Sequence, residues 1–201
     1  MLPPVVQPPP PAFRRLAALT LLLAPLAAAA AGVPLRLDPA RSKVDIAVKA
    51  TIGSFTAHLQ HFDARIAMDP GDRRVMTATF RCPFAAIDTG NSQRNRDMND
   101  WQDTPRHPEV TFELISLTPA AGDAFTADGR LRFHGVQRHI RFPVTIVPAA
   151  GAVTIDGTAR LDTRDFGLPI IKKFWMLKVD PVVRVTFHLE GELPARRPQA
   201  G

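Results

Sequence analysis

An alternation of apolar and polar residues with a period of two is the feature that most constrains how this chain can fold. The clearest example is 140–146, where Ile140, Phe142, Val144 and Ile146 alternate with polar residues and a proline. Because successive side chains of a β-strand point to opposite faces, this pattern predicts a strand with one face in an apolar interior and the other in water. Comparable runs occupy 44–48, 153–161 and 183–189, and shorter ones occupy 75–82, 110–117 and 125–134. The chain therefore reads as all-β after residue 31.

Two segments depart from this regular pattern. In 55–68 the apolar phase changes at 60–62, which predicts a bulge or a sharp bend. The polar segment 91–101 contains no β-branched residue and begins with Asn91 and Ser92, which are favoured at helix N-caps. We therefore expect one short helix between two strands.

Turn-forming residues separate the expected strands. Proline, glycine and aspartate are concentrated at 69–72, 119–123, 135 and 148–151. About eight strands with hairpin-like spacing and one helical insertion predict an antiparallel barrel or a sandwich. A barrel of about eight strands has an interior that is either filled by its own side chains or able to hold one small ligand.

The N-terminal region has the three parts of a secretory signal. Arg14 and Arg15 precede an apolar stretch at 16–26, and alanines fill 27–31. A short membrane anchor is the alternative, but the stretch is too short to span a bilayer well. We expect residues 1–31 to be a signal peptide, residues 32–195 a β-barrel domain and residues 196–201 a disordered tail. The expected location is the periplasm, an oxidising compartment in which a single cysteine is unsurprising.

The charge of the chain is only mildly positive. Its formal net charge is +6, and Arg14 and Arg15 of the expected signal contribute two of these charges. An excess of this size does not predict a nucleic-acid partner, although it is compatible with transient contact with an anionic membrane surface.

The sequence contains none of the common catalytic or phosphate-binding motifs. His58 and His61 are three residues apart, which on a straight strand places them on opposite faces, so surface residues are expected rather than metal ligands. Asp162 and Arg164 fit an exposed ion pair at a turn, and Cys82 fits a buried small residue. We therefore expect neither catalytic residues nor a metal site.

The segment 168–177 is unusually apolar for a connection between two strands. Ordinary core packing explains such a segment, and so does a position at the mouth of an elongated apolar cavity. Both interpretations are compatible with the sequence.

Five short motifs occur in order along the chain. They are the opening strand and turn at 37–42, the Ile87-Asp88-Thr89-Gly90-Asn91 segment before the helix, the strand entry His107-Pro108-Glu109-Val110-Thr111-Phe112, the Gly129-x-Leu131 to Gly135-Val136 hairpin, and the turn Arg164-Asp165-Phe166-Gly167. Together they resemble the YceI-like family over nearly all of 35–193, in which the third reads Tyr-Pro-x-Ile-x-Phe and the fifth Arg-x-x-Phe-Gly. The helical segment departs from the family pattern, and either Arg94 or Arg96 could occupy the usual arginine position.

The resemblance implies an all-β, antiparallel, lipocalin-like barrel of about eight strands that binds a long-chain isoprenoid, of polyprenyl or quinone type, or a fatty-acyl lipid. It implies a carrier without a cofactor rather than an enzyme, and one that could pair as a homodimer. We take as candidate channel residues apolar residues that face inward on the expected strands, together with residues of the apolar segment 168–177. They are Phe80, Phe112, Leu131, Phe133, Phe142, Val144, Ile146, Ile155, Phe166, Ile170, Phe174, Trp175 and Met176.

Two other classes of function stay open. An enzyme acting on a lipid or quinone would need a polar pair inside the channel, and His134 and Asp162 are the candidates. A structural or interaction protein would instead have a fully packed barrel without a cavity.

Overall fold

The computed structural model describes residues 32–51, 53–69, 71, 74–149, 152–173 and 177–194. The long strands are β3 (Lys43–Val48), β4 (Phe55–Leu59), β5 (Asp63–Met68), β6 (Val75–Pro83), β8 (Glu109–Pro119), β9 (Ala124–Phe133), β10 (Val136–Pro148), β11 (Ala152–Asp162) and β14 (Val182–Glu192). Five strands have two residues each, namely β1 (Val33–Pro34), β2 (Arg36–Leu37), β7 (Ile87–Asp88), β12 (Lys172–Lys173) and β13 (Leu177–Lys178). The helices are α1 (Ser92–Gln102) and the 3-10 turns η1 (Phe84–Ala86) and η2 (Thr163–Phe166).

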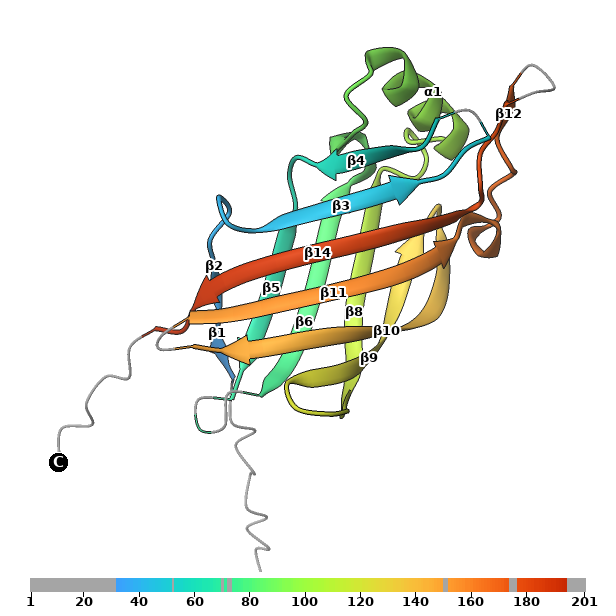
Figure 1. Ribbon diagram of the computed structural model, residues 1–201. Coiled ribbons are helices and arrows are strands. Elements are labelled where there is room, and N and C mark those ends of the chain that lie inside the picture. Colours follow the sequence, from blue (N-terminus) through green and yellow to red (C-terminus); the bar gives the residue numbers. More distant parts are fainter. Residues whose placement is uncertain are drawn as a thin grey trace, which may run out of the picture.

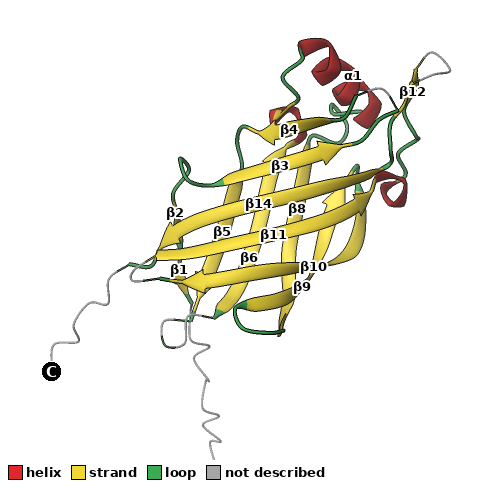
Figure 2. Cartoon of the chain, viewed as in Figure 1, coloured by secondary structure: helices red, strands yellow, loops and turns green. Residues whose placement is uncertain are grey.

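Twelve of these strands form one antiparallel sheet in the order β1-β5-β6-β8-β9-β10-β11-β14-β3-β4-β7, with β2 beside β14. The sheet curls so that β3, β14 and β11 pass in front of β5, β6 and β8 (Figure 1). Helix α1 and the β12–β13 hairpin lie at one end of the curled sheet, and strands make up most of the remainder (Figure 2). Among the described residues, no helix is long and apolar enough to cross a membrane.

The expected antiparallel all-β barrel with one helix is confirmed, but the main sheet has twelve strands rather than about eight. The segment 55–68 accounts for part of the difference, because it bends at 60–62 into two strands, β4 and β5, that pair with different neighbours. The remaining additional strands, β1, β2 and β7, have two residues each. A pattern with a period of two cannot identify elements this short.

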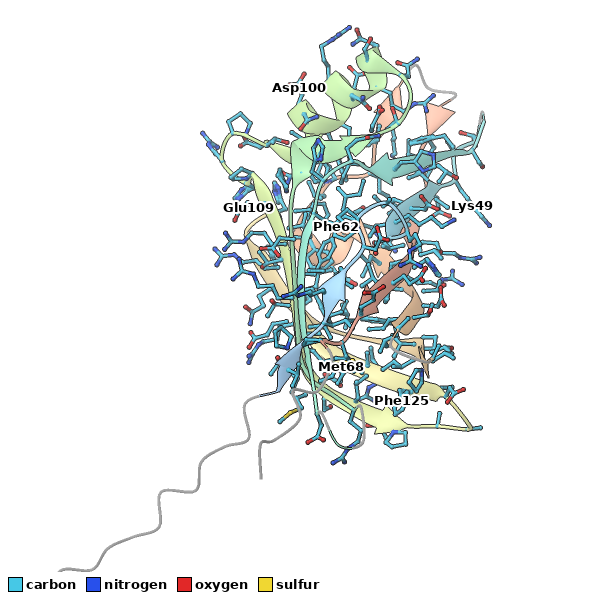
Figure 3. The ribbon with its side chains drawn as sticks, turned by 90° about the vertical axis from the view of Figure 1, so that its left-hand side faces the viewer. Lys49, Phe62, Met68, Asp100, Glu109 and Phe125 are labelled. Atoms are coloured by element: carbon cyan, nitrogen blue, oxygen red, sulfur yellow. The ribbon has the colours of Figure 1, made fainter. Side chains whose placement is uncertain are left out.

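Strands β4 and β5 lie next to the two opposite edges of the curled sheet, and the line where they face one another is the seam of the barrel. At one end of the seam the N-terminal segment crosses it, because β1 pairs with β5 and β2 pairs with β14. At the other end the chain crosses from β6 through η1 to β7, which pairs with β4. Phe62 lies at this seam, where its ring stacks on that of Phe80 with the centroids 5.6 Å apart (Figure 3).

Helix α1 begins and ends where local chemistry requires it. The side chain of Asn91 accepts a hydrogen bond from the backbone N–H of Arg94 at 2.9 Å, which is the N-cap predicted from the sequence. The helix ends at Asp103, which has a left-handed conformation with φ of 53°. The helix lies at one end of the barrel, and several of its residues line that end of the cavity inside it.

Candidate functional site

The curled sheet encloses a cavity of about 940 Å³. This volume is near the upper end of the range found for small-molecule sites in proteins. The wall consists mainly of apolar side chains on the inward faces of β3, β4, β5, β6, β8, β9, β10, β11 and β14. The alternation that predicted the strands also places these side chains, because all four apolar positions of β10, from Ile140 to Ile146, lie on the wall.

The structure places nine of the thirteen candidate channel residues on the cavity wall. These are Phe80, Phe112, Leu131, Phe133, Phe142, Val144, Ile146, Ile155 and Ile170. Phe166 is not on the wall, because the 3-10 turn η2 packs its ring against Phe133, with the centroids 5.4 Å apart, in a separate part of the core. Phe174, Trp175 and Met176 lie outside the described residues.

Several wall residues are absent from the sequence-based set although the alternation includes them. Examples are Val44 and Ile46 on β3 and Val185, Phe187 and Leu189 on β14. Small residues at other wall positions, namely Ala57, Ala127 and Ala159, leave the space between the larger side chains unfilled. A set weighted toward aromatic residues could not identify alanines as cavity-forming.

One end of the cavity is polar and the rest is apolar. All five charged residues that line the cavity lie at the end formed by α1, the segment after η2 and the start of β14. They are Arg94, Asp97, Asp100, Lys172 and Asp180. Asp100 marks this end in Figure 3, and Met68 and Phe125 mark the opposite end. A ligand with a polar head and a long apolar tail matches this distribution.

Arg94 is the arginine of the helical segment that turns toward the cavity. It is half-buried, and its guanidinium carbon lies 4.1 Å from the centroid of the Phe55 ring, which is a cation–π contact. Arg96 is exposed and donates a hydrogen bond to Oε1 of Gln93 at 2.7 Å. Of the two arginines that the sequence left open, Arg94 therefore lies at the cavity.

Helix α1 is tied to the segment that follows η2. Nε1 of Trp101 donates a hydrogen bond to the backbone carbonyl of Pro169 at 2.8 Å, and both residues line the cavity. Replacing Trp101 by phenylalanine keeps an aromatic ring but removes this donor. We expect Trp101→Phe to lower the free energy of unfolding by about 1 kcal/mol, the usual net value of one hydrogen bond. Urea denaturation would measure it, and an unchanged midpoint would show that the bond does not stabilise this end.

Cys82 is buried and also lines the cavity. Burial, and to a smaller extent the negative charge of Glu109, raise the pKa of its thiol to about 12. The thiol is therefore protonated at neutral pH and a poor nucleophile. We expect iodoacetamide at pH 8 to leave the native protein unmodified and to alkylate it rapidly in urea, as measured by the mass of the intact chain. Fast alkylation of the native protein would contradict this prediction.

The two candidates for a polar catalytic pair do not line the cavity. Nδ1 of His134 is 2.8 Å from the backbone carbonyl oxygen of Gln102, at the β9–β10 turn. Asp162 accepts a hydrogen bond from Nε of Arg164 at 2.9 Å, and this bond is the main cause that lowers the pKa of the carboxyl group. The structure thus gives the Asp162–Arg164 turn the exposed ion pair expected from the sequence.

The histidines of the β4–β5 segment are on the surface. His58 and His61 are both exposed, and Nδ1 of His58 lies 2.8 Å from a carboxylate oxygen of Asp45 on the neighbouring strand. Within the described part of the chain, no group of three histidine, cysteine or acidic residues is arranged to hold a metal ion.

A family model for the YceI-like domain matches residues 35–191, which covers nearly the whole barrel. The chain belongs to the YceI-like family. A UPF0312 protein of Azotobacter vinelandii is 22% identical over 115 residues, which cover 53% of this chain and 60% of that protein. The chain therefore matches less than two thirds of the length of this relative.

Two solved structures have the same fold. The crystal structure of Burkholderia cenocepacia BcnA has a TM-score of 0.68 and 24% sequence identity, covering 77% of this chain and 99% of that one. The Campylobacter jejuni YceI protein has a TM-score of 0.62 and 15% identity, covering 72% and 88% of the two chains. Family and fold together support a binding-protein fold.

Proposed function

We propose that this YceI-like protein binds a long-chain lipid in its cavity, with an isoprenoid of polyprenyl or quinone type or a fatty-acyl chain as the ligand. The observation that carries the proposal is the cavity of about 940 Å³, whose charged residues all lie at one end. A cavity of this kind accepts an apolar tail along its length and leaves a polar head near α1. It also argues against a fully packed barrel.

The energetics of such binding are favourable without many polar contacts. Burying roughly 400 Å² of ligand hydrocarbon is worth on the order of 10 kcal/mol, at about 25 cal/mol per Å². Association and ordering of the tail cost several kcal/mol of this. The remainder corresponds to micromolar or sub-micromolar binding, and the length of the cavity then becomes the main source of specificity.

The polar end favours a small head group over a strongly anionic one. Arg94 and Lys172 supply positive charge there, but Asp97, Asp100 and Asp180 supply negative charge at the same end. A head group with hydrogen-bonding oxygens, such as a carboxyl, a hydroxyl or a quinone ring, fits this mixed environment.

The proposed location is the periplasm, with residues 1–31 as the signal for export. A carrier there would take its ligand from a membrane, so transient contact with a lipid surface is part of the proposal. A homodimer through the 168–177 region is proposed as well. Size-exclusion chromatography with light scattering would measure its mass.

The proposal is tested by asking what the cavity contains. The protein would be expressed with its own N-terminal region, purified from the periplasm without detergent, extracted with organic solvent and analysed by mass spectrometry. We expect a near-stoichiometric long-chain species. An empty extract, followed by no binding of polyprenyl or fatty-acyl probes to folded, monodisperse protein, would overturn the proposal.

A further inference from the structure

A belt of phenylalanine and glycine residues crosses the cavity wall between its two ends. Five adjacent strands, β8, β9, β10, β11 and β14, contribute Phe112, Gly129, Phe142, Gly157 and Phe187 in that order. The ring of Phe142 is in the middle, with its centroid 5.6 Å from that of Phe112 and 6.0 Å from that of Phe187. All three rings line the cavity. We call these five residues the aromatic belt.

The rings of Phe112 and Phe187 pack directly on the backbone of Gly129 and Gly157, respectively. A Cβ atom at Gly129 would lie 2.3 Å from Cε2 and Cζ of Phe112 and 2.7 Å from the backbone oxygen of Glu113, whereas the three atoms nearest to a Cβ at Gly157 would all belong to the ring of Phe187, with Cζ at 2.3 Å. Such approaches are far inside van der Waals contact, so only glycine allows each ring to lie on its neighbouring strand. Neither glycine has a positive φ, so their backbone conformation does not require glycine.

Glycine inside a strand is unfavourable unless another part of the molecule must approach closely. In the aromatic belt the approaching group is a phenylalanine ring that would otherwise project into the cavity. The two glycines therefore keep the rings of Phe112 and Phe187 against the wall.

The aromatic belt lies part-way along the cavity. Along β14, Phe187 is about 13 Å from Val183, which is near the polar end, and about 7 Å from Leu189, at a rise of roughly 3.3 Å per residue. Val183, Leu189 and, beyond the belt, Ile146 all line the cavity. A tail that enters from the α1 end must pass the aromatic belt to reach Ile146 and Leu189.

We propose that Gly129 and Gly157 determine the length of chain that the protein accepts, by holding the rings of Phe112 and Phe187 on the wall and so keeping the far part of the cavity open. This inference rests on the proposed function. A side chain at either glycine pushes a ring into the cavity and closes it at the depth of the belt. Short ligands, which end before the belt, are unaffected by such a change.

The test compares wild type with Gly157→Ala over a series of fatty acids from octanoate to tetracosanoate, by isothermal titration. In the wild type the affinity should keep rising with chain length beyond the belt. In Gly157→Ala we expect the longest chains to lose about tenfold in affinity and the shortest to change less than about twofold. The double variant Gly157→Ala/Phe187→Leu, which removes the clashing ring, should restore binding of the longest chains.

Three results would overturn the inference: equal affinities in the wild type and Gly157→Ala at every length, equal losses at every length, or a double variant that does not recover. Circular dichroism would establish that each variant is folded. If Gly157→Ala does not fold, Gly129→Ala is the second variant, and it is judged by its dependence on chain length alone, because its Cβ also approaches the backbone oxygen of Glu113 at 2.7 Å. The proposed function fails differently, because the wild type would then bind no chain of any length.

Discussion

Replacing Ala159 by phenylalanine should reduce the affinity for a long-chain lipid by about a hundredfold, because the new ring occupies space that the ligand needs. Ala159 lies on β11 opposite Val185, on the wall of the cavity, and its side chain is small enough to leave that space open. The ring enters a cavity rather than a packed core, so we expect the thermal midpoint of unfolding to stay the same or to rise. Titration with a fluorescent fatty-acyl probe measures the affinity.

A matched control is available on β3, where Ala47 is exposed on the outer face of the barrel. Ala47→Phe adds the same group outside the cavity and should leave the affinity for the probe unchanged. If Ala159→Phe is folded and binds the probe as the wild type does, the ligand does not occupy this part of the cavity.

Phe142→Asp should nearly abolish lipid binding and should also destabilise the fold. Phe142 is 7% exposed, faces the cavity and contacts two other rings of the aromatic belt. Removing the ring and placing a carboxylate there should lower the free energy of unfolding by roughly 3–5 kcal/mol at neutral pH. Urea denaturation gives the stability, and titration of the folded variant at low temperature gives the affinity.

The pH dependence of this variant separates the effect of charge from that of lost volume. Burial disfavours the charged form, so the introduced carboxyl group should have a raised pKa in the folded protein. Its charge then destabilises the fold increasingly as pH rises above the unfolded pKa of about 3.9, and part of the stability should return on lowering the pH from 7 toward 4.5. Wild type in the same buffers corrects for other groups, and Phe142→Leu, which loses the ring without a charge, should show no such recovery.

Periodicity of apolar residues was sufficient to predict the long strands and most of their inward faces, but not the two-residue strands. Ile140 and Phe142 show this, because their place in the alternation is also their place on the cavity wall. Phe166 shows the limit, since a residue in a turn has no strand phase and its ring packs elsewhere in the core. The aromatic content of a segment therefore did not reveal which rings face the cavity.

Long-range arrangement explains what the sequence left open. The packing of the Phe187 ring on Gly157 depends on the pairing of β14 with β11. Gly157 and Phe187 are thirty positions apart in the chain, so no local pattern predicts this contact. Likewise, the hydrogen bond from Trp101 to Pro169 ties α1 to a distant segment with which it shares no local pattern. Local periodicity gives the faces of strands, but neighbours across the barrel set the shape of the cavity.

The seam between β4 and β5 gives the barrel the mechanics of a split ring. Within the described part of the chain these two strands do not pair with one another, and short crossings clasp the slit at both ends, β1 with β2 at one and β7 at the other. Such a barrel can widen by separating β4 from β5, because no ladder among the described residues joins these two strands, and every long hydrogen-bonded ladder then stays intact. The circumference of the barrel is therefore easier to change than its length.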